Sequence, residues 1–235
     1  MAGLTIVTFK WGDKYGADYV AKLQGGVRRN LRQDCRFVCF TDHVEGEPEI
    51  THHRRYGEIE LHALPAAAKY LTAVKGCFAR LSLFDPDVQR LLGFPGDRIV
   101  CMDLDLVITG PLDDLFARPE PFTILQGVNS ANPCPFNGSL WMLEAGYRPD
   151  VWNEFSLELA AKVPFYEFPD DQAWLADMLP DAGSFGPEDG VYAFQKRGWP
   201  KGEALPRNAR IVAFPGWRDP SQYTRLDWMQ EHWRV

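Results

Sequence analysis

The stretch Arg98-Ile99-Val100-Cys101-Met102-Asp103-Leu104-Asp105-Leu106-Val107-Ile108 decides the fold. Apolar residues run through it almost without a break, which is typical of a central parallel strand covered on both faces. We therefore predict one buried strand over 98–108 in an α/β sheet. Side chains alternate along a strand, so Asp103 and Asp105 are expected to point the same way, about 6 to 7 Å apart.

Two carboxylates in an apolar strand indicate a ligand site. Removing each from water costs several kcal/mol, so we expect them where the strand opens into a cleft, with a positive charge between them. A hard divalent cation with oxygen ligands, Mg²⁺ or Mn²⁺, suits Asp103 and Asp105. Asp-x-Asp alone is more typical of a solvated strand end. Here the turn signal Gly110-Pro111 follows closely, which places the pair at the edge where open α/β sheets bind ligands.

Composition narrows the class of protein. The 235 residues carry a net charge of −7, with 46% hydrophobic and 24% charged residues, as in a globular protein without a basic stripe for a nucleic-acid polymer. No apolar run approaches the roughly 18–20 residues of a membrane span. The five cysteines form no C-x-x-C pair and no zinc-ligand spacing with histidine, which is typical of reduced thiols in the cytoplasm.

The chain begins with a β-α-β pattern that favours one doubly wound domain over 1–235. We predict strands over 4–9, 36–42, 122–128, 136–143 and 210–214, and helices over 18–31, 66–84, 150–161, from 170 onward and over 226–235. The first loop contains only Gly12 and Gly16, without G-x-G-x-x-G or a Walker-A pattern. A nicotinamide dehydrogenase is therefore disfavoured.

Other polar residues leave alternatives open. Arg80 is either a solvated residue or a phosphate ligand, for which its planar fork is suited. Asn137 begins an apolar strand, where its amide needs a partner. Asp170-Asp171 at a helix start is typical of N-terminal capping. The neighbouring His52 and His53 would face opposite ways in a strand, which disfavours a shared catalytic role.

Several motifs occur together in one order: Tyr15 in the first loop, Arg80-Leu81, Asp103-Leu104-Asp105, Phe136-Asn137-Gly138-Ser139, Asp171-Gln172 and Phe214-Pro215-Gly216. Over nearly its whole length the chain thereby resembles the GT-A glycosyltransferases, most closely the family-8-like retaining galactosyl- and glucosyltransferases of bacteria. The resemblance implies a Rossmann-like, mostly parallel mixed sheet flanked by helices. It also implies a nucleotide-binding half, 1–108, and a sugar and acceptor half, 109–235.

The resemblance implies a UDP-sugar donor and a role for each matching residue. Tyr15 would stack on the uracil, and Arg80 would contact the donor. Asp103 and Asp105 would hold Mn²⁺ or Mg²⁺. The rest of the nucleotide would lie against the first strand, its loop and the acidic tripeptide, at Thr8, Phe9, Lys10, Gly12 and Leu104.

For the transferred sugar, the resemblance implies three further contacts. Asn137 and Asp171 would bind sugar hydroxyls, and Gln172 would sit under the anomeric carbon. An amide is a poor nucleophile, which favours a front-face reaction assisted by the leaving phosphate over a covalent intermediate. The acceptor, a glycan, lipid or protein, is not readable from the sequence; its site is expected in the loops 43–65 and 180–208.

The chain departs from the family pattern in its last strand. Ala213 stands where a histidine usually supplies a third metal ligand, and Asp219-Pro220 stands where Lys-Pro is usual. Arg218 would restore the positive charge, and His232 would restore an imidazole if the tail folds over the cleft. Without these replacements the metal would be held more weakly.

Three other functions remain as alternatives. A nucleotide-sugar-binding protein without turnover is suggested by Ala213. A sugar-phosphate nucleotidyltransferase shares a similar sheet but needs a glycine-rich basic loop, which residues 12–16 match poorly. A glycoside hydrolase using Asp103 and Asp171 is the least favoured, because nothing in the sequence indicates its acid and base spacing.

Overall fold

A computed structural model describes residues 3–44, 59–164 and 169–235. Its main sheet has seven strands in the order β3-β2-β1-β4-β7-β6-β8. Strands β3, β2, β1 and β4 run parallel, β7 is antiparallel to both β4 and β6, and β8 is parallel to β6. The mixed, mostly parallel α/β sheet confirms the predicted fold class. Its strands are β1 Leu4–Lys10, β2 Arg36–Thr41, β3 Glu60–Ala63, β4 Arg98–Met102, β6 Phe122–Gln126, β7 Phe136–Glu144 and β8 Gly183–Phe185.

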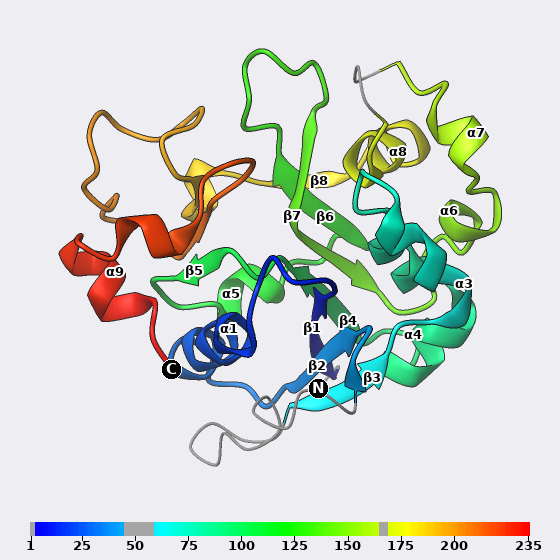
Figure 1. Ribbon diagram of the computed structural model, residues 1–235, viewed down its shortest axis with the longest axis horizontal. Helices are drawn as coiled ribbons and strands as arrows, with labels where there is room; N and C mark the ends of the chain where they lie inside the picture. The colour runs from blue at the N-terminus through cyan, green and yellow to red at the C-terminus, as the bar shows by residue number, and fades with distance from the viewer. Residues whose placement is uncertain (1–2, 45–58, 165–168) are drawn as a thin grey trace.

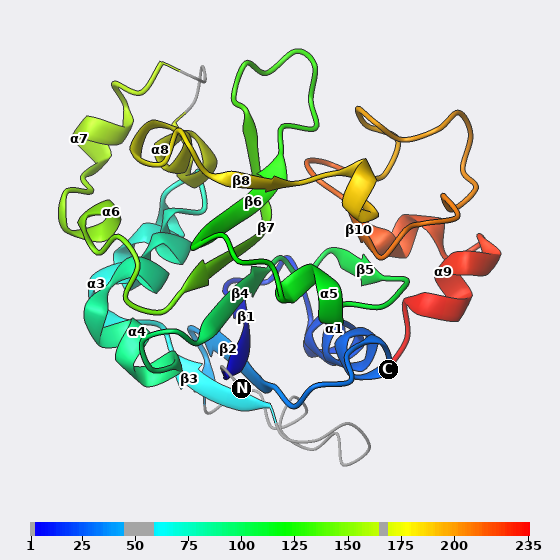
Figure 2. The same ribbon diagram turned by 180° about the vertical axis from the view of Figure 1, so that it is seen from behind.

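A second, three-stranded sheet has the order β5-β10-β9. Its strands are β5 Leu106–Ile108, β9 Val191–Ala193 and β10 Ile211–Ala213, with β10 antiparallel to β5 and parallel to β9. Figure 2 shows this small sheet beside helices α1 Ala17–Asn30 and α9 Asp227–His232.

Helices cover both faces of the main sheet (Figure 1). One face packs against α1, α5 Asp113–Phe116 and the small sheet. The other face packs against α3 Ala66–Lys69, α4 Pro86–Leu92, α6 Asp150–Asn153, α7 Leu157–Ala160, α8 Asp171–Met178 and the 3₁₀ helices η2 Tyr70–Ala73 and η3 Phe78–Phe84. Helix α9 and the 3₁₀ helix η5 Pro220–Tyr223 lie against the small sheet, and the 3₁₀ helix η4 Pro187–Asp189 precedes β9.

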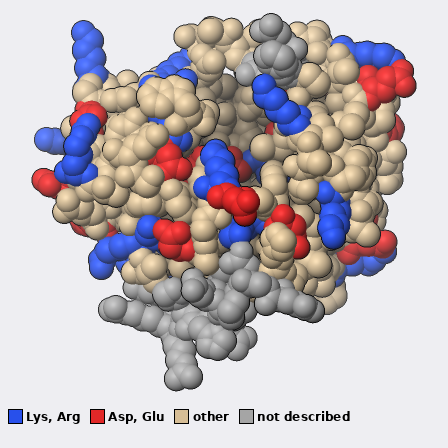
Figure 3. All heavy atoms as spheres, in the orientation of Figure 1, with Lys and Arg blue, Asp and Glu red and all other residues tan. Residues whose placement is uncertain are grey.

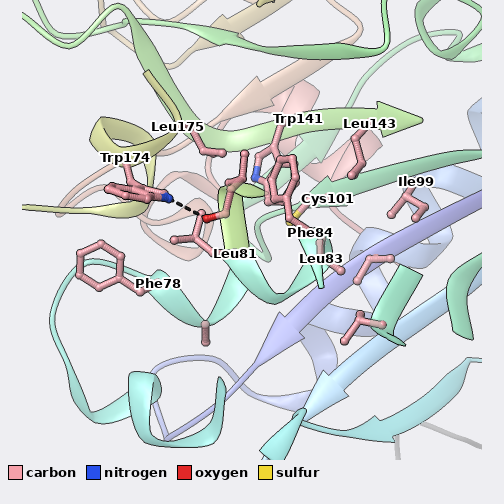
Figure 4. Packing of buried hydrophobic residues seen from close by; sticks show 14 of the residues in the cluster. Phe78, Leu81, Leu83, Phe84, Ile99, Cys101, Trp141, Leu143, Trp174 and Leu175 are labelled. Carbon is pink, nitrogen blue, oxygen red and sulfur yellow. Dashed lines mark hydrogen bonds between the residues drawn. The ribbon is translucent and has the colours of Figure 1, made fainter. Parts of the chain in front are cut away.

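Alternation along the strands explains why both faces are covered. In β4, Ile99 and Cys101 belong to one hydrophobic cluster, and Val100 and Met102 belong to the other. In the first cluster, shown in Figure 4, the Phe84 ring stacks on Trp141 with centroids 5.4 Å apart. The Trp174 indole donates to the Val151 carbonyl at 2.9 Å, which satisfies its buried N–H.

The predicted strand over 98–108 is wrong in one respect. It ends as β4 at Met102, turns at residues 103–105, and continues as β5 in the small sheet. The Asp103 N–H donates to the Ser139 carbonyl at 2.9 Å, and the Leu106 N–H donates back to the Asp103 carbonyl at 3.3 Å. The two aspartates therefore lie in a tight turn between two sheets, and the alternation of a strand does not apply to them.

The predicted helix over 66–84 is also wrong, because it is broken into α3, η2 and η3. The break contains Gly76 at φ 122° and Cys77 at φ 57°, both in the left-handed region. A side chain at Gly76 would meet the Pro169 carbonyl oxygen at 2.8 Å, so glycine allows η3 to begin against the start of α8.

The other predicted elements hold with smaller changes. The helix over 150–161 is two short helices, α6 and α7, and Ser156 caps the second by accepting from the Leu159 N–H. The tail helix is confined to Asp227–His232. His52 and His53 lie outside the described residues. Within the described ranges, no helix combines the length and apolar character needed to cross a membrane.

Candidate active site

A cleft of about 470 Å³ opens where β1 and β4 end and β7 begins. This is the edge at which open α/β sheets bind ligands, and the volume is within the range of small-molecule sites. Figure 3 shows the hollow in this face of the molecule. Lining residues come from far apart in the sequence: Phe9, Trp11, Lys14, Tyr15, Lys75, Gly76, Cys77, Arg80, Asp103, Leu104, Asp105, Asn137, Gly138, Ser139, Pro169, Asp170, Asp171, Gln172, Pro215 and Gly216.

Asp105 presents an incompletely bonded carboxylate to this cleft. It is only 7% exposed, and the Tyr15 hydroxyl donates to its Oδ2 at 2.7 Å. Its Oδ1 is buried and has no hydrogen-bond partner among the described residues. Burial, and then the nearby Asp103, raise the pKa of Asp105 to about 7. A buried, unsatisfied carboxylate oxygen is costly, so this end of the cleft is suited to a positively charged ligand.

The Arg80 guanidinium, which also contacts Asp103, has more hydrogen-bond partners than the Asp105 carboxylate. Its Nε and Nη2 contact Oδ2 of Asp171 at 2.7 and 2.6 Å, and its Nη1 donates to Oδ1 of Asp103 and to the Gly138 carbonyl. We call Arg80, Asp103 and Asp171 the Arg80 cluster. Arg80 is 5% exposed and Asp171 is 2% exposed. Burial raises the pKa of Asp171 to about 7, against the opposing effect of Arg80.

Two glycines make room for the Arg80 cluster. A Cβ at Gly138 would lie 2.6 Å from Arg80 Nη2, so only glycine fits beside the guanidinium. The Asp171 N–H donates to the Gly76 carbonyl at 2.9 Å, which fixes α8 against the start of η3. The cluster therefore depends on backbone that has been brought together from three distant parts of the chain.

The three residues at the start of α8 have separate partners. Asp170 is the N-cap, as its sequence position predicts: its Oδ1 accepts from the Ala173 N–H at 2.8 Å. Asp171 pairs with Arg80. The Gln172 side-chain oxygen accepts from the Gly138 N–H at 3.1 Å, and the Gln172 side chain acts to lower the pKa of Asp170, against the larger effect of burial, which raises it. Asn137 reaches the same Gln172 oxygen at 3.5 Å.

Most of the predicted site residues line the cleft, and five do not. Thr8 is fully buried and donates to the Met102 carbonyl at 2.8 Å, and Lys10 is 6% exposed. The Gly12 N–H donates to Asp42 Oδ2 at 3.0 Å. These residues position the first loop behind the lining side chains. Arg218 lies with its guanidinium 4.8 Å from the exposed Trp217 ring.

The structure does not bring His232 to the two aspartates. His232 ends α9, its backbone carbonyl accepts from Arg29 at 2.8 Å, and its imidazole Nε2 is 3.8 Å from the Glu231 carboxylate. The tail is held away from the cleft because Met229 and Trp233 pack in one hydrophobic cluster with Val107 and Val212 of the small sheet. The expectation that the tail replaces the missing imidazole is therefore not met.

The sequence predicted no site role for Lys14, Lys75 or Cys77, whereas residues 8–12, which include Trp11, are expected beside the nucleotide. Lys14 lies with its Nζ 4.5 Å from the centre of the Tyr15 ring, and Trp11, Lys75 and Cys77 line the cleft beside it. Lys14 and Trp11 belong to the loop that leaves the first strand, which is a usable signal. The breaks that place Lys75 and Cys77 in the cleft depend on contacts with α8, which the local sequence does not encode.

The donor atoms at the turn fit a divalent cation that shares its ligands with a substrate. Asp103 and Asp105 supply carboxylate oxygens, and Mg²⁺ is commonly bound by one or two carboxylates together with substrate phosphates. In the parts of the chain that the structure describes, no group of three or more His, Cys, Asp or Glu side chains is arranged to hold a metal. Ala213, fully buried in β10 opposite Leu106, adds no ligand. The residues therefore fit a cation bound together with a phosphate ligand.

Comparison with known proteins identifies the fold. No protein-family model matches the sequence, and no curated protein sequence matches it either. Among solved structures, mouse xyloside xylosyltransferase 1 in its apo form is similar, with a TM-score of 0.60, 12% identity, and coverage of 91% of this chain and 98% of that one. The galactosyltransferase LgtC, in complex with donor and acceptor sugar analogues, is similar with a TM-score of 0.64, 11% identity, and coverage of 98% and 97%. The chain therefore has the GT-A glycosyltransferase fold.

Proposed function

We propose that this protein is a glycosyltransferase that moves a hexose from a UDP-sugar to an acceptor with retention of configuration, assisted by Mn²⁺ or Mg²⁺. The observation that carries the proposal is the buried Oδ1 of Asp105, which has no hydrogen-bond partner in the described part of the chain and lies beside Asp103 in a cleft at the ligand-binding edge of a GT-A fold. A cation bound by a sugar nucleotide's diphosphate would satisfy that oxygen.

The proposal assigns a role to each group of residues that lines the cleft. When bound, the cation stabilises the negative charge that develops on the diphosphate as the sugar leaves. Asp103 and Asp105 would hold it, and the Tyr15 hydroxyl fixes the orientation of the Asp105 carboxylate. The Tyr15 and Trp11 rings line the adjoining wall, where a uracil would stack. Asn137 and Gln172 line the wall that the sugar would reach.

The proposed reaction proceeds on the front face of the sugar. The bond from the anomeric carbon to the diphosphate oxygen breaks, and its electron pair stays on that oxygen. The acceptor hydroxyl oxygen bonds to the anomeric carbon and gives its proton to the departing phosphate. The Gln172 oxygen already accepts from the Gly138 N–H, which supports this route over attack by the amide.

The two similar structures are named for xylosyl and galactosyl transfer, so the donor panel should include several sugars. A direct test incubates the protein with UDP- and GDP-linked galactose, glucose, their N-acetyl forms and UDP-xylose, and follows release of the nucleoside diphosphate by mass spectrometry. We expect release from a UDP-hexose that depends on Mn²⁺ or Mg²⁺. No release from any of these donors, with or without metal and with sugar acceptors added, would contradict the proposal.

A nucleotide-sugar-binding protein without turnover is the second candidate. It is favoured by Ala213, which supplies no metal ligand, and by the ion pair that already links Asp103 to Arg80. Calorimetry distinguishes the two: both functions predict UDP binding, but only the transferase predicts release of UDP from a UDP-sugar.

A further inference from the structure

We propose that Asp170 is a catalytic carboxylate: its charge faces the sugar in the cleft and stabilises the positive charge that develops on the anomeric carbon. The inference rests on the proposed glycosyl transfer and assigns a role that neither the N-cap position nor the motif resemblance gives to this residue.

The other carboxylates of the cleft are already engaged. Asp171 is 2% exposed and receives both the Nε and Nη2 of Arg80 on one oxygen. Asp103 pairs with Nη1 of the same guanidinium. Asp105 is assigned to the cation and accepts from Tyr15. None of these three has a charge free to face the sugar.

Gln172 is also engaged, and its orientation is fixed. The backbone N–H of Gly138 can only donate, so the atom of Gln172 that lies 3.1 Å from it must be the amide oxygen. The amide nitrogen is then the end of Gln172 that is left to face Asp170, and Gln172 acts on that carboxyl in the direction that lowers its pKa. Gln172 is therefore a positioning residue, which is fixed to the start of β7 by its oxygen and favours the charged form of Asp170.

Asp170 lines the cleft and keeps capacity to bind a cationic group. One of its oxygens, Oδ1, accepts from the Ala173 N–H. Among the residues that the structure describes, no lysine or arginine nitrogen forms an ion pair with it, whereas Asp103 and Asp171 share Arg80. Its negative charge is therefore the least compensated at the α8 end of the cleft.

The Arg80 cluster indicates the direction in which a bound donor would extend through the cleft. Arg80 bridges Asp103, at the turn, and Asp171, at α8, so the cleft runs from the cation end to the α8 end along this bridge. A donor with its diphosphate at Asp103 and Asp105 would extend its sugar toward Asp170. As the bond to the diphosphate breaks, positive charge develops on the sugar, and Asp170 stabilises it without forming a covalent bond.

Asp170→Asn separates this role from capping, because asparagine caps a helix as well as aspartate does. We expect turnover to fall about 100-fold, the scale of losing one electrostatic group in an active site. The melting temperature and the affinity for UDP should stay as in the wild type. The matched control is Asp85→Asn, which changes the N-cap of α4 outside the cleft and should leave turnover unchanged.

A binding measurement tests the charge without turnover. A protonated iminosugar, such as deoxynojirimycin or its galacto epimer, mimics the cationic sugar, and its affinity is measured in the presence of UDP. We expect Asp170→Asn to weaken it at least about tenfold, as for loss of one charged hydrogen bond. Equal iminosugar affinity, or full turnover by Asp170→Asn, would overturn the proposal. If the wild type binds the iminosugar through Asp170 but releases no UDP from any donor, the proposed glycosyl transfer fails and the sugar contact stands.

Discussion

Arg80 and Asp105 lie on the same cleft, yet the protein completes the bonding of one and leaves the other incomplete. The buried Arg80 has two carboxylates and the Gly138 carbonyl as partners, all supplied by the chain. The buried Asp105 has the Tyr15 hydroxyl on one oxygen and no described partner on the other. The comparison indicates that the Arg80 cluster shapes the site, whereas the Asp105 end keeps a carboxylate oxygen with capacity for a further contact.

The largest expected effect comes from removing Arg80. Arg80→Met leaves Asp171 and Asp103 without their shared cation, and breaking a buried pair from one side costs about 3–5 kcal/mol of unfolding free energy. Urea denaturation measures it. The matched control is Arg90→Met, which removes an exposed pair with Asp87 and should cost less than about 0.5 kcal/mol. A loss of under about 1 kcal/mol for Arg80→Met would show that the cluster does not organise the site.

Asp105, in contrast to Arg80, should lower the stability of the protein, and this effect should depend on pH. The folded Asp105 keeps its proton up to a pKa of about 7, whereas the unfolded chain loses it near 4, so the folded state binds more protons in between. The free energy of unfolding should therefore fall as the pH rises from 4 to 7, by about 2–4 kcal/mol. Asp105→Asn removes this fall.

The test compares urea denaturation of the wild type and Asp105→Asn at pH 5 and pH 8. Asp171 contributes the same trend to both proteins, so the difference between them isolates Asp105. We expect Asp105→Asn to lose less stability between the two pH values. Parallel behaviour of the two proteins would mean that Asp105 is not held in an unfavourable environment.

A smaller loss of stability is expected at Gly138, which lies beside the Arg80 guanidinium. Gly138→Ala places a methyl group 2.6 Å from Arg80 Nη2 and should cost about 1–3 kcal/mol by overpacking. In the Arg80→Met background the clashing nitrogen is absent, so the cost of Gly138→Ala should shrink; the double-mutant cycle measures that coupling. Equal costs in both backgrounds would show that Arg80 is not the reason for the glycine.

The sequence predicted those features that depend on interactions within a single helix or strand. The apolar run of β4, the amphipathic α1 and the cap at Asp170 follow from residues within one element. The end of β4 at Met102 does not, because residues 98–108 are equally apolar on both sides of the turn, and the change of partner strand, from β7 for β4 to β10 for β5, depends on distant parts of the chain. The same limit explains the broken helix over 66–84, whose break lies against α8.

Most of the residues that line the cleft were predictable from the sequence, but the partners of these residues were not. Arg80 was expected to contact the donor, a role still untested, and it lies with its fork on Asp171, which is 91 residues away. Asp171 and Asp170 have the same local pattern, yet one pairs with Arg80 and the other faces the cleft. Only the packing of α8 on η3 and β7 separates their roles.

The most direct test is the affinity for UDP, measured by calorimetry with and without Mn²⁺, for the wild type and for Asp105→Asn. If the open carboxylate binds a cation that is shared with a diphosphate, Mn²⁺ should tighten UDP binding to the wild type by at least about tenfold, and by much less for Asp105→Asn. UDP affinity that is the same with and without Mn²⁺ in both proteins would contradict the account.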